Sequence, residues 1–230
     1  MITNWASYYK ERRDSVVYVP EAFIARFFLS SRPIRFAHNY KFANKTILDI
    51  GCGSGRHLNF FSTLGLHPTG VDVSLSQIDK SVAGTSNLAE GSFAAMPVFE
   101  KRFDFVVSVN SIYYCSSELE LESNLKVVFD NLDHNGFAVI SLVGDEHFVL
   151  NDSVDFHRYT YETSTREGFH QCGVNRVFVP RDRSALIDLF CRVGFSTSSI
   201  RVGRIKDELD GFVRDLYYVY ARKGDLPLIL

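Results

Sequence analysis

Short apolar runs alternate with amphipathic segments between residues 45 and 143 of the chain. Runs of strand length that are rich in β-branched residues predict buried strands, and apolar residues at helical spacing predict the helices between them. The strands are expected at residues 45–50, in HPTGVDVS ending at Asp72 and Val73, at 87–92, in FDFVVSVNS and at 137–143; the helices are expected at 56–64, 75–83 and 118–132. This alternation is typical of a parallel sheet covered by helices on both faces.

The pattern changes on either side of this region. Residues 144–182 are polar and aromatic with little periodicity, and so long a segment without clear elements is usually functional. Regularity returns with a helix at 183–193 and with two segments, GFSTSSIRV and GFVRDLYYVYAR, which are expected to pair at one edge of the sheet. Residues 1–44 are rich in aromatic side chains and are expected to form helices packing over one end of the sheet.

Composition narrows the class of protein. The chain has 230 residues, of which 46% are hydrophobic and 23% charged, and this balance fits one globular domain. The net charge is −2 with both signs interspersed, so we expect neither a nucleic acid nor an anionic membrane as partner. No apolar run approaches the roughly 20 residues that span a bilayer. The four cysteines are far apart without CxxC spacing, which favours free thiols and a cytoplasmic location.

Three glycines stand at alternate positions directly after the first expected strand, in ILDIGCGSGRH at residues 47–57. A glycine cluster in a well-patterned chain is explained by a tight turn, or by a turn whose backbone must approach a ligand. Ligands bind at the carboxyl ends of the strands in α/β sheets, and the helix that follows directs its N-terminus towards them. Asp49 precedes the first glycine, and Asp72 ends the second strand, where a carboxylate can accept both hydroxyls of a ribose.

The glycine spacing separates two classes of cofactor. A dinucleotide-binding loop has the pattern G-x-G-x-x-G, with its third glycine opening the helix. Counted from Gly51 and Gly53, that glycine would occupy position 56, where this chain has Arg56. The observed pattern is G-x-G-x-G with an acidic residue two positions before it, so the loop departs from the dinucleotide fingerprint.

Three motifs in order resemble those of class I S-adenosylmethionine-dependent methyltransferases. ILDIGCGSGRH resembles motif I, GVDVS resembles the acidic ribose-binding strand end, and GSFAAMPVFEKRFDFVVSVNSIYY resembles the stretch around the third and fourth strands. The resemblance covers about residues 45–143. It implies a doubly wound, mostly parallel seven-stranded sheet with helices on both faces, an N-terminal helical lid, and S-adenosyl-L-methionine as cofactor.

The same resemblance divides the chain into the parts of a single domain. These are an N-terminal helical cap (1–44), a cofactor-binding core (45–143), a substrate-region insertion (144–182) and a C-terminal helix with a strand pair (183–230). Small-molecule members often use an N-terminal helix as a lid, and Trp5, Tyr8 and Tyr9 would serve here either as lid residues or as core aromatics.

Site residues follow from the resemblance position by position. Gly51, Cys52 and Gly53 would line the methionine part of the cofactor, Asp49 would reach its amino group, and Asp72 would bind the ribose. Cys52 is expected to be a small filler rather than a nucleophile, because nothing adjacent stabilises a thiolate beyond the helix N-terminus.

The adenine and sulfonium ends are assigned in the same way. Val73 would pack on the adenine, and Ser92 and Phe93 would flank the ring. Asn110 and Ser111 would close under the sulfonium and carboxylate. The family often has aspartate where this chain has Ser92, so the contact with the adenine amino group would fall to the serine hydroxyl or the Phe93 backbone.

Methyl transfer is an in-line displacement that requires mainly alignment and exclusion of water. An amine or thiolate acceptor needs no base, whereas a sugar hydroxyl does. The candidates for a base or for contact with the acceptor are Asp145, His147, His157, Glu167 and His170 in the irregular segment, and Tyr113, which with Tyr114 follows the fourth strand. Packing is the equal alternative for the tyrosines, and the irregular histidine spacings favour no metal.

The sequence therefore predicts a methyltransferase that acts on an oxygen or nitrogen of a small molecule such as a sugar, as a monomer or homodimer. Two alternatives stay open. One is an NAD(P)-dependent or nucleotide-sugar oxidoreductase, and the other is a non-catalytic S-adenosylmethionine-binding module.

Overall fold

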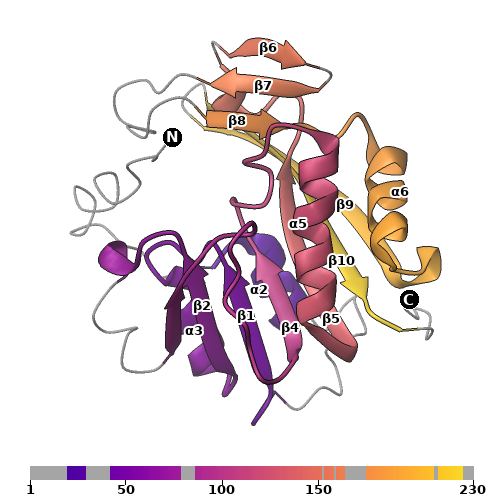
Figure 1. The fold of residues 1–230 in the computed structure, drawn as a ribbon. Coiled ribbons are helices and arrows are strands. Elements are labelled where there is room, and N and C mark those ends of the chain that lie inside the picture. Colours follow the sequence, from indigo (N-terminus) through magenta and orange to yellow (C-terminus); the bar gives the residue numbers. More distant parts are fainter. Residues whose placement is uncertain are drawn as a thin grey trace.

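A seven-stranded sheet forms the centre of the computed structural model (Figure 1). The structure describes residues 20–29, 42–78, 86–151, 153–157, 159–163, 175–209 and 212–224. In spatial order the strands are β3 (Asn87–Glu90), β2 (His67–Asp72), β1 (Thr46–Ile50), β4 (Phe103–Ser108), β5 (Leu132–Val143), β10 (Phe212–Arg222) and β9 (Ile200–Leu209). The first five are parallel, and β10 pairs antiparallel with both of its neighbours.

The chain order reverses between β1 and β4, which are parallel neighbours although β2 and β3 lie between them in sequence. A ligand crevice is expected outside the carboxyl ends of the strands at such a point. The expected fold class, a mostly parallel seven-stranded sheet with helices on both faces, is confirmed.

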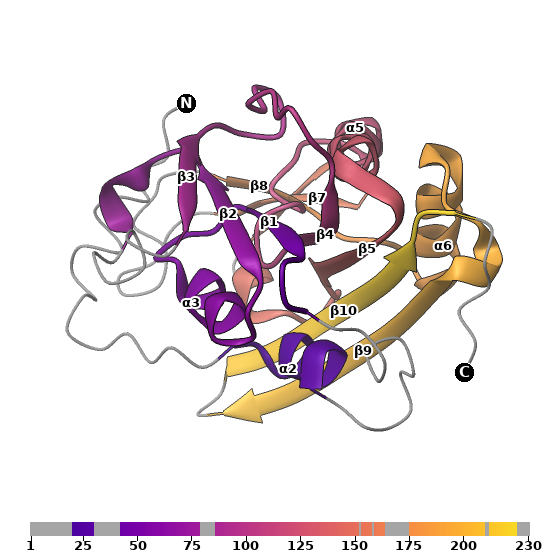
Figure 2. The same cartoon turned by 90° about the horizontal axis from the view of Figure 1, so that it is seen from below.

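Helices cover the two faces of the sheet in pairs, as Figure 2 shows. One face carries α2 (Ala22–Leu29) and α3 (Arg56–Thr63), and the other carries α5 (Glu118–Asn131) and α6 (Arg183–Val193). The Ser117 and Asp182 side chains cap α5 and α6 by accepting hydrogen bonds from backbone amides of the first turn. Gly194 ends α6 at φ 118°.

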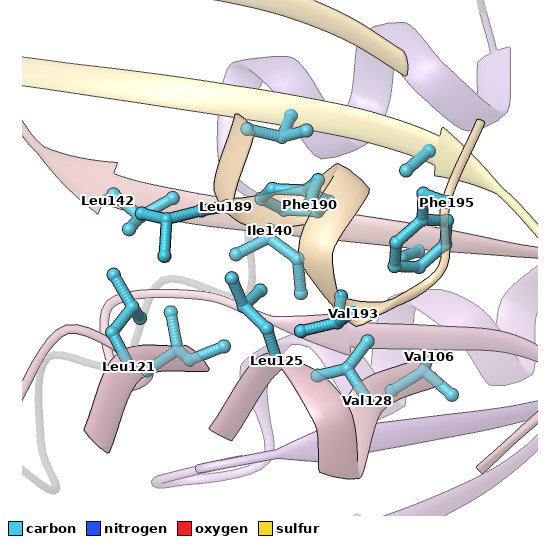
Figure 3. Packing of buried hydrophobic residues seen from close by; sticks show 14 of the residues in the cluster. Val106, Leu121, Leu125, Val128, Ile140, Leu142, Leu189, Phe190, Val193 and Phe195 are labelled. Atoms are coloured by element: carbon cyan, nitrogen blue, oxygen red, sulfur yellow. The ribbon is translucent and has the colours of Figure 1, made fainter. Parts of the chain in front are cut away.

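The larger core lies between the sheet and the α5–α6 pair (Figure 3). Side chains of α5 and α6 point toward one another and toward the strands beneath them. The labelled residues of this core are Val106, Leu121, Leu125, Val128, Ile140, Leu142, Leu189, Phe190, Val193 and Phe195. Leu121, Leu125 and Val128 are the stripe that predicted α5, and each is fully buried.

On the opposite face α2 packs through aromatic side chains. Phe27 makes edge contacts with Phe105 of β4 and Phe137 of β5, and it also packs on Tyr220 of β10. The described part of the N-terminal region thus covers a face of the sheet rather than one end, because its buried phenylalanines have ring partners there. Trp5, Tyr8 and Tyr9, the expected lid aromatics, lie outside the described residues.

The segment expected to lack clear elements contains a second, antiparallel sheet, and the prediction was wrong here. Its strands are β6 (Val154–His157), β7 (Thr160–Thr163) and β8 (Asn175–Phe178), and it lies above the main sheet in Figure 1. Each strand has four residues, which is too short for an alternating pattern to stand out from a polar background.

A smaller difference concerns the helix expected at 75–83. The structure has a 3₁₀ turn, η2 (Leu75–Gln77), and residues 79–85 lie outside the described part. Ser74 caps this turn as expected, since its side chain accepts from the Ser76 amide.

Candidate functional site

The three glycines of residues 51–55 form a loop between β1 and α3 that needs glycine. Gly51, Gly53 and Gly55 have φ values of 79°, 57° and 84°, in the left-handed region that side chains disfavour. The Gly51 amide donates to the Val71 carbonyl oxygen at 2.7 Å, and the Cys52 amide donates to the same oxygen at 3.1 Å. The loop is therefore held against the end of β2 and leads directly into α3.

Gly51 also allows Ser111, in the segment that follows β4, to approach the glycine loop closely. A Cβ atom there would lie 2.3 Å from the Ser111 Cβ, so any side chain would displace that residue. The Ser111 hydroxyl donates to the Ile50 carbonyl oxygen at 2.8 Å and forms a hydrogen bond with Ser108 at 2.6 Å. Ser111 thus lies beside the glycine loop.

Asp72 is tied to the same loop from the end of β2. The Gly53 amide donates to its Oδ2 at 2.9 Å, and the Ser74 amide lies 3.4 Å from its Oδ1. These two contacts fix the Asp72 carboxylate beside the glycine loop. The next residue, Val73, is 57% exposed. Glu90 at the end of β3 lies opposite Asp72 in the register of the two parallel strands.

Asp49 is the most unusual group of the site. It is 1% exposed, and its Oδ2 has no hydrogen-bond partner among the described residues. The pKa of this carboxyl is raised to about 7: burial is the main cause, the nearby Asp72 carboxylate adds to the rise, and the Arg56 guanidinium opposes it. A buried acceptor without a donor fits a ligand that brings an ammonium group.

His57 on α3 is the neighbour of that orphan oxygen. Its Nδ1 lies 3.9 Å from Asp49 Oδ2, and its Nε2 accepts the Glu21 amide at 3.4 Å. The acceptor role of Nε2 places the proton on Nδ1. Burial lowers the pKa of this imidazole to about 3, so His57 is neutral at physiological pH.

Asn110 joins the ends of β4 and β5. Its amide donates to the Ser141 hydroxyl at 2.8 Å, and that hydroxyl lies 3.3 Å from the Asn110 carboxamide oxygen. Asn110 is exposed and has a φ of 56°, a conformation that asparagine tolerates better than most residues. The structure therefore brings the predicted residues of β1, β2 and β4 together at one edge of the sheet.

Ser92 and Phe93 follow β3. The Ala95 amide is within reach of the Ser92 hydroxyl at 3.2 Å, so this hydroxyl stabilises a local turn. Phe93 is half-buried against the core. Cys52 is buried, and desolvation together with the Asp49 charge raises the pKa of its thiol well above the usual range, in agreement with a packing role.

The candidates beyond the cofactor residues are more scattered. His147 is buried and caps η3 (Phe148–Leu150); its Nδ1 accepts the Val149 amide at 3.1 Å, so that lone pair is engaged. Tyr113 is 3% exposed and packs with Val143 and Val149. The position of the His157 side chain is not described, and Glu167 and His170 lie outside the described residues.

Asp145, the remaining acidic candidate, belongs to an ion network after β5. Arg204 of β9 contacts both Asp145 and the fully buried Asp215, with 2.6 Å between Arg204 Nε and Asp215 Oδ1. Its guanidinium also lies 3.2 Å from the Tyr217 hydroxyl. In the part of the chain that the structure describes, no three metal-ligating side chains cluster, and no helix is long and apolar enough to cross a membrane.

Three residues close to Asp49 were missed as site residues. Arg56 and His57 are the last two residues of ILDIGCGSGRH. The signal that could have identified them as site residues is that both are polar and open a helix beside a buried strand end. Glu21 had no such signal, because its contact with Arg56 at 3.1 Å spans 35 positions in the sequence.

The comparisons with known proteins address the family to which the chain belongs. Residues 20–199 match a family described as a methyltransferase domain. A protein of Encephalitozoon cuniculi named as a methyltransferase is 33% identical over 111 residues, covering 48% of this chain and 50% of that protein. The chain thus matches about half the length of this curated relative.

Solved structures share the fold at lower identity. A methyltransferase from Methanosarcina mazei has a TM-score of 0.62 at 19% identity, over 85% of this chain and 99% of that one. An amino pentose methyltransferase from Micromonospora echinaspora, with S-adenosylmethionine bound, has a TM-score of 0.60 at 20% identity, over 93% of this chain and 95% of that one. Because the family match covers most of the sequence, this chain belongs to the methyltransferase domain family.

Proposed function

We propose that this protein transfers a methyl group from S-adenosyl-L-methionine to an oxygen or nitrogen of a small molecule. The observation that carries the proposal is the buried Asp49 carboxylate beside a glycine loop, with one oxygen that accepts no hydrogen bond from the described residues. The cofactor has an ammonium group that would satisfy this oxygen. A dinucleotide offers no such cation for a carboxylate in this position.

The residues present fit the cofactor at each of its parts. Asp49 would hold the amino group, while Gly51, Cys52 and Gly53 would border the methionine chain, because the positive φ values of the two glycines let the chain turn there. Asp72, whose Oδ2 accepts the Gly53 amide at the end of β2, would accept the ribose hydroxyls.

The adenine and the sulfonium of the cofactor would contact residues that follow the ends of β2, β3 and β4. Val73, which is exposed next to Asp72, would cover the adenine, and Ser92 with Phe93 would border its edge. Asn110 and Ser111, fixed by hydrogen bonds to Ser141 and Ile50, would form the floor near the reacting methyl group.

When bound, the cofactor supplies a methyl group already activated by a positively charged sulfur. The protein's contribution is to orient the acceptor in line with that group and to exclude water. The small sheet of β6, β7 and β8 lies above the main sheet and is the element we assign to the acceptor side (Figure 1).

A small-molecule acceptor is supported by two observations. The amino pentose methyltransferase of similar fold covers almost the whole chain, and the even charge balance offers no polybasic surface for RNA or DNA. We retain a monomer or homodimer in the cytoplasm as part of the proposal.

The test is methyl transfer from isotope-labelled S-adenosylmethionine to a panel of amino sugars, neutral sugars, aromatic amines and tRNA, followed by mass spectrometry. Labelled product from a small molecule, lost in Asp49→Asn, is the expected result. Cofactor binding without transfer to any acceptor would favour the non-catalytic module, and labelled tRNA would contradict the substrate class.

A further inference from the structure

Three charged side chains from distant parts of the chain meet beside the start of α3. Glu21, directly before α2, is only 9% exposed, and its two carboxylate oxygens face different cations. One lies 3.1 Å from Arg56, the first residue of α3, and the other lies 3.0 Å from Arg214 of β10. The Glu21 carboxylate therefore connects three elements, which are α2, the start of α3 after the glycine loop, and β10.

The backbone of Glu21 reaches the same site. Its amide donates to His57 Nε2 at 3.4 Å, which leaves the imidazole proton on Nδ1, the atom 3.9 Å from the unpartnered oxygen of Asp49. Both the amide and the carboxylate of one residue thus contact the two side chains that open α3 next to Asp49.

The groups around Asp49 have unequal effects on its charge. Asp72 on β2 disfavours the ionised form, and the thiol of Cys52 adds no charge because its pKa is raised well above the usual range. His57 is neutral. Among the described residues, the Arg56 guanidinium is the cation that favours the Asp49 carboxylate, and it lowers the pKa of Asp49 against the effect of burial.

We propose that Glu21 is a positioning residue for cofactor binding: its carboxylate holds Arg56 and its amide holds His57, the two side chains that open α3 beside Asp49. Seating of α2 on the sheet and affinity for the cofactor are then coupled, since Glu21 directly precedes the buried phenylalanines of α2. This inference rests on the proposed function, because it assigns Asp49 to the ammonium group of the cofactor.

The test measures the affinity of S-adenosylhomocysteine by calorimetry between pH 6 and 9. In the wild-type protein the affinity is expected to rise with pH through about 7, as Asp49 ionises. Arg56→Gln and Glu21→Gln should each shift this rise to higher pH and weaken binding about three- to tenfold at pH 7, with recovery at pH 9. Arg56→Lys keeps the charge and should restore much of the wild-type profile.

A double variant separates positioning from plain stabilisation. If Glu21 acts through Arg56, the Glu21→Gln/Arg56→Gln protein should have the same pH profile as Arg56→Gln alone. Glu122→Gln, which removes a carboxylate 2.8 Å from Arg192 in the exposed α5–α6 contact, is the control and should leave the profile unchanged.

Two results would overturn the inference. One is a Glu21→Gln protein with a lower melting temperature but the wild-type pH profile, and the other is a double variant whose effects add. A wild-type protein that binds no S-adenosylhomocysteine would instead overturn the proposed function, and this inference with it.

Discussion

At the scale of single residues, Asp49 is placed where it destabilises the free protein and suits a cationic ligand. Its carboxyl is buried and lacks a hydrogen-bond donor for one oxygen within the described chain. Unsatisfied buried groups are rare in folded proteins, and functional sites are where stability is commonly given up for binding. The account therefore predicts opposite effects of Asp49 on stability and on affinity.

The Asp49→Asn protein tests this trade-off. Because the folded-state pKa of Asp49 is raised from 3.8 to about 7, wild-type stability falls as the pH rises between those values. Above pH 7 the asparagine variant should be more stable, by on the order of 4 kcal/mol at most, and should bind S-adenosylhomocysteine more weakly. Urea unfolding at pH 5 and pH 8 checks the sign. A variant less stable than wild type at pH 8 would contradict it.

Gly51 gives a second prediction at this scale, with a matched control in Gly65. Both have a positive φ, 79° and 80°, so alanine causes similar backbone strain of about 1–2 kcal/mol at either position. A Cβ on Gly51 would collide with Ser111, whereas the nearest atom to a Cβ on Gly65 is 3.8 Å away.

Gly51→Ala should therefore reduce affinity for S-adenosylhomocysteine at least tenfold, while Gly65→Ala lowers only the melting temperature. Calorimetric titration and thermal unfolding of the two proteins distinguish these effects. Equal losses of affinity would mean that the approach of Gly51 to Ser111 has no part in the site.

At the scale of elements, the parallel strands of the main sheet were predictable from the sequence and the small sheet was not. The carboxyl ends of β1, β2 and β4 could be located from neighbouring residues in the sequence. Gly51, Asp72 and Asn110 each follow or end an apolar run. The small sheet depends on pairing between β7 and β8, which are separated by 11 residues and have little pattern of their own. The packing of α2 on a face also depends on distant partners such as Phe137 and Tyr220.

The junction of β5, β10 and β9 makes a prediction about stability. Arg204 contacts Asp215 through two nitrogens, and Asp215 is fully buried. Arg204→Met keeps much of the side-chain volume but leaves that carboxylate without its cation, which should cost on the order of 3 kcal/mol.

The control for this prediction is Arg192→Met, which removes exposed ion pairs between α6 and α5 and should cost below about 1 kcal/mol. Urea denaturation of both proteins gives the comparison. Similar losses in the two variants would show that the Arg204 contact behaves as an ordinary surface pair.

At the scale of the whole molecule, the strand order β3-β2-β1-β4-β5-β10-β9 puts the reversal of chain order between β1 and β4, where a ligand crevice is expected. The sequence predicted a doubly wound, mostly parallel seven-stranded sheet through the resemblance of three motifs to a known family, without giving the order of the strands.

The most direct test of the account is calorimetric titration of the protein with S-adenosylhomocysteine and, separately, with NAD. Asp72→Asn is the site variant, and Asp133→Asn is the control, since Asp133 is an exposed aspartate near the start of β5. We predict that the wild-type and Asp133→Asn proteins bind S-adenosylhomocysteine alone, and that Asp72→Asn weakens this binding about tenfold or more. Binding of NAD, or of neither compound, would contradict the account.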